Sequence, residues 1–310
     1  MIEVSSLAEL KAHGVRRVAL ACGNFDGLHK GHRTIIDCLL AASKKNDATP
    51  VLMTFHPHPR EVLFGHQIPT LSTMENKAEI LEEMGVKAVV TLPFTKELAS
   101  LTAWNFVQRY LYWPGMRVTD VCIGSQWKFG ASQQGDVTYL RSLGLFKVHG
   151  VGELRQEHEL VSSTRIREAL ASGDMRKAEE LLCRPYKISG EVVHGLKLAT
   201  EVLGFPTANI GFKEKVLPLS GVFAVKVRLP GEKQWRNGAC NVGTAPTFIE
   251  KGSKMGIEVH ILDFDGDLYG KELTVHFVER IRQEKKFDCP EALKEQISKD
   301  VSAARVILEA

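Results

Sequence analysis

The residues best suited to chemistry form a glycine-punctuated segment that ends in two histidines. Residues 23–32 read Gly-Asn-Phe-Asp-Gly-Leu-His-Lys-Gly-His. His29 and His32 are three residues apart, so on a helix that starts near Lys30 both imidazoles lie on one side of the first turn. A helix N-terminus favours an anion, and glycines let a ligand approach the backbone closely. The segment predicts a site for nucleotide phosphates; the alternative is a tight loop with two solvated or buried histidines.

The flanking residues predict the elements that would position this loop. Residues 17–22 form the short apolar run of a buried strand, and residues 33–40 have helical spacing. Apolar strands continue to alternate with helix-like segments up to about residue 182, which predicts a parallel sheet with helices on both faces. The expected strands are 17–22, 50–55, 87–92, 118–123 and 146–151, and the expected helices include 76–84 and 103–112. Such sheets bind ligands at the carboxyl ends of their strands, where residues 23–32 would lie.

A second polar string, Val-Ser-Ser-Thr-Arg-Ile-Arg, occupies residues 161–167. Serine or threonine ahead of an apolar-periodic stretch is typical of a helix N-cap. The string therefore predicts a helix start that could hold an anion, or simply a cap whose two arginines lie in solvent.

The pattern changes after residues 182–185. We expect β-strands, a hairpin turn at Asp265-Gly266, and a final helix over residues 290–308. The expected strands are 186–194, 221–229, 235–242, 256–264 and 271–280. A small antiparallel β-barrel is the natural interpretation. We place the domain boundary at 183–186, with domains 1–183 and 184–310.

The first-domain strings resemble those of a known family. His-x-Gly-His resembles the signature of nucleotidyltransferases, and Gly-Asn-Phe-Asp-Gly resembles the N-terminal module of the bacterial bifunctional riboflavin kinase/FMN adenylyltransferases. Ser-Ser-Thr-x-Ile-Arg and residues 55–60, Phe-His-Pro-His-Pro-Arg, are similar to further family motifs. The resemblance implies a Rossmann-like fold in which His29 and His32 are catalytic. It implies nucleotide or flavin contacts for Gly23, Asn24, Phe25, Asp26, Gly31, His58, Ser163, Thr164 and Arg167.

The second half is similar to riboflavin kinases. Residues 204–210, Gly-Phe-Pro-Thr-Ala-Asn-Ile, resemble their Pro-Thr-Ala-Asn motif, and 241–248, 257–260 and 267–270 match in family order. The resemblance implies that Thr207 and Asn209 hold Mg²⁺, a cation that prefers oxygen ligands. A bulge or loop with local turn bonds is the alternative at 204–210.

Two further residues of this half receive roles from the resemblance. Glu258 is the implied general base for the riboflavin 5′-hydroxyl, unless it is a strand glutamate that faces solvent. Residues 196–202, the loop that would cover the ATP phosphates, lack the family's usual glycines and arginines, and Lys197 is expected to replace the lost positive charge.

The resemblance implies one enzyme that makes FMN from riboflavin and FAD from FMN, with Mg-ATP used twice and flavins bound as substrate and product. Gln126, Gln133 and Leu160 depart from the family pattern. They motivate an alternative, a riboflavin kinase whose adenylyltransferase is weak or lost. Departures in both halves motivate another, a non-catalytic flavin-binding regulator.

Composition limits the partners. The 310 residues are 44% hydrophobic and 25% charged, with a formal net charge of +3. This charge suits anionic small molecules but is too small and too evenly spread to indicate nucleic acid. No apolar run approaches the roughly 20 residues of a membrane span, and the N-terminus lacks signal-peptide features. We expect a cytoplasmic protein, a monomer or weak homo-oligomer, without nucleic-acid or membrane partners.

Overall fold

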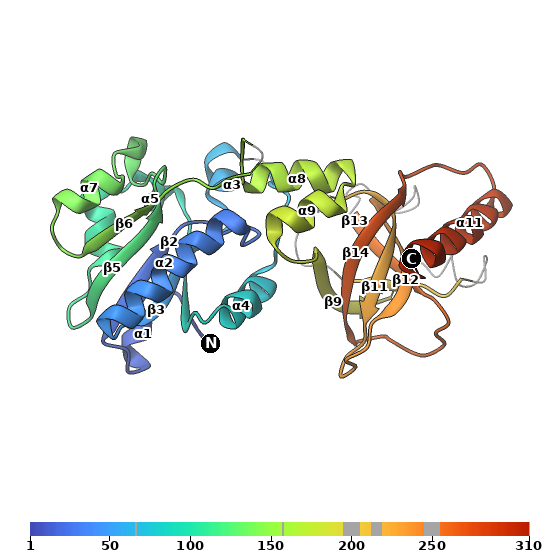
Figure 1. Ribbon diagram of the computed structural model, residues 1–310, viewed down its shortest axis with the longest axis horizontal. Coiled ribbons are helices and arrows are strands. Elements are labelled where there is room, and N and C mark those ends of the chain that lie inside the picture. Colours follow the sequence, from blue (N-terminus) through green and yellow to red (C-terminus); the bar gives the residue numbers. More distant parts are fainter. Residues whose placement is uncertain (66, 157, 195–204, 212–218, 245–254, 310) are drawn as a thin grey trace. The chain divides into compact units, whose positions relative to one another are not determined.

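The computed structural model describes residues 1–310 except 66, 157, 195–204, 212–218, 245–254 and 310. By its internal contacts the chain divides into two compact units (Figure 1). The first consists of Met1–Ile68 and Ser72–Ser162, and the second of Pro69–Leu71 and Ser163–Ala310. The main segment of the second unit therefore begins at Ser163. The domain boundary that we placed at 183–186 stays a prediction. Lys197 lies outside the described residues.

A six-stranded parallel sheet organises the first unit, in the order β1-β4-β3-β2-β5-β6. The strands are β1 (Ile2–Val4), β2 (Arg17–Cys22), β3 (Thr49–His56), β4 (Ala88–Pro93), β5 (Arg117–Gly124) and β6 (Lys147–Val151). The parallel sheet and its five predicted strands are confirmed. The prediction did not include β1, because three residues are too few to show a period.

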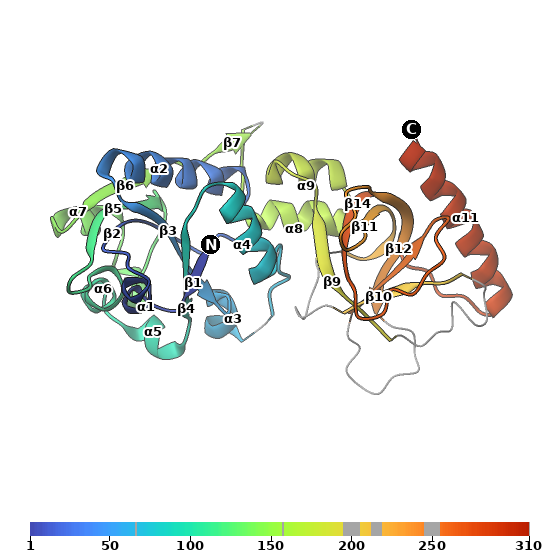
Figure 2. The ribbon, with the colours of Figure 1, turned by 90° about the horizontal axis from the view of Figure 1, so that it is seen from below.

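Helices cover both faces of this sheet, as predicted. Alternate side chains of β2 lie on opposite faces of the sheet. Ala19 and Ala21 pack toward α2 and α4, whereas Val18 and Leu20 pack on the other face. Figure 2 shows α2 on one side of the sheet and α1, α5 and α6 on the other. The helical segments are α1 (Leu7–Ala12), α2 (Lys30–Asn46), α3 (Pro59–Phe64), α4 (Met74–Glu83), α5 (Lys96–Ser100), α6 (Ala103–Phe106), the π-helical η1 (Val107–Leu111), the 3₁₀-helical η2 (Ala131–Gln133) and α7 (Val137–Ser142). A short ribbon, β7 (Arg155–Gln156) and β8 (Glu159–Leu160), follows.

The strand order fixes where this unit can bind a ligand. β3 and β4 follow one another on one side of β2, and β5 and β6 lie on its other side. This reversal makes a topological switch point between β2 and β5, where open α/β sheets form their ligand crevice. The segments after Cys22 and after Gly124 border that point.

The second unit is built around a closed antiparallel barrel in the order β10-β13-β12-β11-β14-β9, which confirms the predicted barrel. The strands are β9 (Lys187–Val193), β10 (Ala208–Ile210), β11 (Gly221–Arg228), β12 (Arg236–Thr244), β13 (Met255–Ile261) and β14 (Glu272–Arg282). The helices are α8 (Ser163–Ser172) and α9 (Met175–Leu182) before the barrel and α11 (Pro290–Glu309) after it. The predicted final helix is confirmed. The residues of the short β10 were predicted as part of the 204–210 motif and not as a strand.

The predicted hairpin at Asp265-Gly266 is wrong. β13 pairs with β12 and β10, and β14 pairs with β11 and β9, so the segment between them connects strands that are not neighbours. Asp-Gly indicates a local turn but not the partner of the next strand. Here Asp263 adopts a left-handed conformation, φ 54°, and its carboxylate accepts two bonds from Arg305 of α11 at 2.6 and 2.8 Å.

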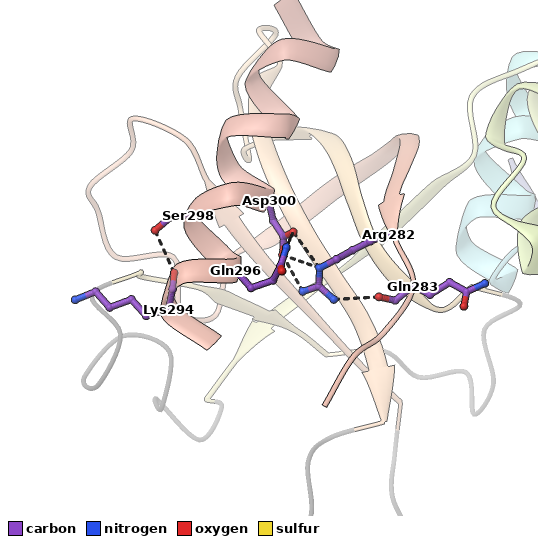
Figure 3. Close-up of polar contacts among 6 residues, drawn as sticks. All are labelled: Arg282, Gln283, Lys294, Gln296, Ser298 and Asp300. Carbon is purple, nitrogen blue, oxygen red and sulfur yellow. Dashed lines mark hydrogen bonds and ion pairs between the residues drawn. The ribbon is translucent and has the colours of Figure 1, made fainter. Parts of the chain in front are cut away.

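A buried ion pair holds α11 on the barrel (Figure 3). Ala304 of the helix packs on Ala224 and Ala239, whose small side chains let the helix lie close to β11 and β12. Beside them, Arg282 Nε lies 3.0 Å from both carboxylate oxygens of Asp300, and Nη2 donates to Oδ2 at 2.8 Å. Asp300 is only 4% exposed. The pair is therefore largely removed from water.

Replacing Asp300 with alanine should destabilise the second unit by about 3 kcal/mol, because the partly buried guanidinium of Arg282 loses its counter-charge and a buried set of hydrogen bonds is lost. Urea unfolding and hydrogen exchange of α11 and β14 amides measure this. The control is Glu295→Ala, which removes an exposed ion pair to Lys299 on the same helix and should cost less than about 0.5 kcal/mol. Equal costs for the two variants would contradict the argument.

Candidate active sites

The segment after β2 is a tightly constrained turn. Phe25 and Leu28 adopt left-handed conformations, φ 49° and 43°, and their side chains are 1% and 0% exposed. Gly27, φ 79°, adopts the same region without a side-chain penalty. Two non-glycine residues in this region cost conformational energy, which is offset by burial of their side chains. The turn thus fixes the direction in which the chain enters α2.

His29 and His32 lie together at the N-terminus of α2. His29 is the N-cap, and its Nδ1 accepts the backbone N–H of His32 at 3.3 Å. Since Nδ1 accepts, the proton of the neutral His29 ring is on Nε2. The two imidazoles stack with centroids 3.7 Å apart and planes 17° from parallel. Both imidazoles therefore lie on one side of the first turn, as the spacing predicted.

Gly31 leaves room for this stack. A Cβ at Gly31 would lie 3.2 Å from Cε1 and 3.3 Å from Nδ1 of His29, closer than ordinary contact. The glycine therefore lets the helix begin directly beneath the His29 ring. Gly23 has a similar role toward Phe25, whose ring a Cβ would approach to 3.2 Å.

The turn is also tied to the segment after β3. The Asn24 carbonyl accepts Thr54 Oγ1 at 2.9 Å and Lys77 Nζ at 3.2 Å. The Asn24 side chain lies 3.5 Å from Nε2 of His58, which is the N-cap of α3. Asp26 is buried as well, at 6% exposure. Of the predicted first-unit residues, those from Gly23 to His32 and His58 therefore come together.

Sequence reasoning missed Lys77. It is 6% exposed and lies on α4, far from the motif in sequence. Its ammonium donates to the Asn24 carbonyl at 3.2 Å and so brings a positive charge to the Gly23–His32 segment. A lysine in an otherwise amphipathic helix usually lies in solvent, so only the three-dimensional arrangement distinguishes it.

Gln126 and Gln133 follow β5, at the other side of the switch point. Both side chains are exposed, and Gln133 has φ 58°. Between them, the Trp127 and Phe129 rings stack with centroids 4.8 Å apart and anchor the segment in the apolar layer. The two glutamines thus lie on a loop that is anchored in the apolar layer and, through the Ala131 N–H to the Leu101 carbonyl at 2.7 Å, on the segment before α6.

Ser163, Thr164 and Arg167 lie at the start of α8, in the second unit. Arg167 Nε donates to the Pro69 carbonyl at 2.6 Å, within the same unit. At the far end of α8, Arg280 of β14 donates to the carbonyls of Ala171, at 3.2 Å, and of Ser172. A helix start with two hydroxyls is suited to an anion. That these residues face His29 and His32 stays a prediction.

Three polar side chains form a row across neighbouring strands of the barrel. Glu258 of β13 is opposite Asn209 of β10 and also opposite Asn241 of β12. Directly opposed residues place their side chains on one face. The alternating neighbours, such as Ile257 and Val259, are 1% exposed and fill the interior. The row therefore lies on the outer face of the barrel wall.

Glu258 is half-buried in this row, and burial raises the pKa of its carboxyl above the 4.5 of an ordinary glutamate. A carboxylate with a raised pKa is a stronger base, which suits proton abstraction from a hydroxyl. The alternative of a solvated strand glutamate does not fit this burial.

Oxygen donors close to Glu258 suit a hard cation. Asn209 lies opposite it, and the half-buried Thr207 lies two residues before Asn209. Within the described residues, no group of three or more His, Cys, Asp or Glu side chains could hold a metal by itself. Magnesium commonly takes only one or two protein ligands and completes its shell with water and substrate phosphates. The donor set fits such a cation.

The comparisons with known proteins match both halves of the chain. The FAD synthetase family model matches residues 12–165, and the riboflavin kinase model matches 182–308. The chain is 39% identical to the bifunctional riboflavin kinase/FMN adenylyltransferase of Pseudomonas fluorescens over 288 residues, which cover 92% of this chain and 91% of that relative. It is 37% identical over 290 residues to the one of Escherichia coli (strain K12), with 92% and 91% covered.

A solved structure is also similar over the full length. The chain has a TM-score of 0.81 and 29% identity to a structure described as a macrolide-efflux protein from Streptococcus pneumoniae, with 98% of each chain covered. In the described part of this chain, no helix has the length and apolar character needed to span a bilayer.

Proposed function

The chain belongs to the family of bifunctional riboflavin kinase/FMN adenylyltransferases, and on that premise we propose which residues carry its two reactions. It is an enzyme that phosphorylates riboflavin to FMN and transfers the adenylyl group of ATP to FMN, giving FAD and pyrophosphate. The observation that carries this function is the occurrence of both family models, in order, on one chain.

We propose Glu258 as the general base of the kinase reaction. Its carboxylate accepts the proton of the riboflavin 5′-hydroxyl as that oxygen attacks the γ-phosphorus of ATP. The bond from the γ-phosphorus to the β–γ bridging oxygen breaks, and ADP leaves. The raised pKa of Glu258 and its place in the polar row support this role.

Thr207 and Asn209 are the proposed ligands of a magnesium ion. When bound, the ion would supply positive charge that neutralises the charge developing on the phosphate oxygens of ATP. The hydroxyl of Thr207 and the amide oxygen of Asn209 would orient it next to Glu258, which is opposite Asn209. Their oxygen chemistry supports this assignment.

The kinase reaction should show a pH dependence set by Glu258. The base must be ionised, so kcat/KM falls as pH falls through its pKa. Because burial raises that pKa above 4.5, the acid limb should lie at higher pH than for a solvated glutamate. A pH profile of kcat/KM for riboflavin measures it, and an acid limb at or below pH 4.5 would contradict the assignment.

In the adenylyltransferase reaction we propose that His29 and His32 donate to phosphate oxygens of ATP. An oxygen of the FMN phosphate attacks the α-phosphorus, a new phosphoanhydride bond forms, and pyrophosphate leaves. The nucleophile is already ionised, so the site needs positioned donors and positive charge rather than a base. The stacked imidazoles, the α2 N-terminus and Lys77 support this role. We assign the triphosphate to Ser163, Thr164 and Arg167 from the motif.

Two assays on the purified chain test the function. FMN should form from riboflavin and Mg-ATP, and FAD with pyrophosphate should form from FMN and Mg-ATP. An active kinase beside undetectable FAD would reject the bifunctional assignment and would point to the departures at Gln126, Gln133 and Leu160. Flavin binding without either product would favour a regulator.

A further inference from the structure

The pairing of β10 with β13 ends just before the proposed cation-binding segment. Its last pair is Ala208 with Val259. One residue further in this antiparallel register, Thr207 would be opposite His260. Pro206 precedes Thr207 and has no N–H to offer a ladder. The ladder of β10 and β13 therefore ends before Thr207, and a contact outside the ladder has to fix this residue.

The imidazole of His260 supplies the missing attachment. Its Nδ1 lies 2.8 Å from the carbonyl oxygen of Pro206. A carbonyl oxygen only accepts, so Nδ1 carries the proton and donates. The ring of Phe205 meets the imidazole edge to face, with centroids 5.5 Å apart and planes at 88°. A hydrogen bond and a packed ring thus fix residues 205–206 on β13.

The same strand carries the proposed base. Glu258 and His260 are two residues apart on β13, so their side chains lie on one face of the strand. β13 therefore bears both the carboxylate and the residue that holds the Thr207 segment. Because Thr207 directly follows Pro206, loss of this attachment would let its hydroxyl shift relative to the carboxylate.

We propose that His260 is a positioning residue of the kinase site: through Pro206 it sets Thr207, and with it the magnesium site, relative to Glu258. This inference rests on the proposed assignment of Thr207 to magnesium. His260 touches no reacting atom in this scheme. Its loss should therefore weaken the binding of magnesium and ATP more than it slows turnover at saturation.

Three substitutions test this inference. His260→Ala should raise the half-saturating Mg²⁺ concentration of the kinase reaction about tenfold, the scale for residues that orient metal ligands. Its kcat at saturating Mg²⁺ should fall less than about threefold. His260→Asn keeps a donor near the Nδ1 position and should restore the Mg²⁺ dependence, whereas His260→Gln places its amide near Nε2 and should not. Thermal unfolding of the same samples reports on folding.

A general structural role would behave differently. It would give all three variants equal effects or would lower kcat without changing the Mg²⁺ dependence, and either result would overturn the inference. So would a nitrogen NMR spectrum of the wild-type chain in which the His260 proton is on Nε2.

A measurement without turnover separates this inference from the proposed function. Mg²⁺ is titrated into the full chain with ADP and followed at the amide signal of Thr207. A midpoint that rises in His260→Ala and returns in His260→Asn supports the positioning role even if the kinase assay fails. A midpoint that is the same in all variants, or a Thr207 signal that does not respond to Mg²⁺, overturns it.

Discussion

Replacing Glu258 with glutamine should lower the kcat of the riboflavin kinase reaction roughly 10²- to 10⁴-fold, the usual contribution of a positioned general base. Glutamine keeps the size and a hydrogen-bonding oxygen but cannot take the proton of the 5′-hydroxyl. The row with Asn209 and Asn241 stays polar, so binding of riboflavin and Mg-ATP should change little. Initial rates at saturating substrates measure the loss, and the KM values show that binding is retained.

The same chain supplies the controls for this variant. FMN adenylyl transfer should be unchanged, because its proposed histidines belong to the other unit. Glu279→Gln, which changes an exposed glutamate of β14, should leave both reactions intact. A Glu258→Gln enzyme with more than about a tenth of the wild-type kcat would remove Glu258 from the role of base.

The substitution should also change how stability depends on pH. Burial raises the pKa of Glu258 in the folded state, so the folded chain favours the protonated carboxyl. The stability from this group is present below the ordinary pKa of 4.5 and is lost as pH rises through the raised value. Near neutral pH, Glu258→Gln should therefore be at least as stable as the wild type. Thermal unfolding across this pH range measures the difference.

The local structure of the first-unit segment could be predicted because its residues are contiguous in sequence. The strand, turn and helix around Gly23–His32 are neighbours along the chain, so glycine spacing and a 3.6-residue period identify them. The stack of His29 on His32 follows from a three-residue spacing on a helix. Glu258 and Asn209 could be identified only by motif, and their pairing came from the strand register.

The residues that sequence reasoning missed act across long separations. Lys77 reaches the Asn24 carbonyl from α4, and His260 reaches Pro206, 54 positions earlier. Lys77 lies in no pattern that distinguishes it from a solvated side chain, and the match at 257–260 gave His260 no role of its own. The Asp265-Gly266 prediction was wrong for the same reason, since a turn signal is local and the strand order of a barrel is not.

The second large effect is expected at the α2 N-terminus, where His29→Ser should reduce FMN adenylyl transfer roughly 10²- to 10³-fold, as for loss of one preorganised donor to a developing charge. His29 has two roles that must be separated, because it is the N-cap of α2 and a proposed phosphate donor. Serine is a good N-cap, so His29→Ser keeps the helix start and removes only the imidazole. His32→Gln, which removes the other ring of the stack, should cause a similar loss.

The comparison with His29→Ala decides between the two roles of His29. Alanine removes both the cap and the imidazole, so it should cost about 1 kcal/mol of stability more than serine. If the imidazole carries the chemistry, the serine and alanine enzymes should lose adenylyl transfer almost equally, while kinase activity is retained in both. If His29 acted only as a cap, His29→Ser would keep nearly full adenylyl transfer and only the alanine enzyme would be impaired. Pyrophosphate release from FMN and Mg-ATP, read beside the unfolding midpoints of the two variants, distinguishes these outcomes, because cap loss changes stability whereas donor loss changes only the rate.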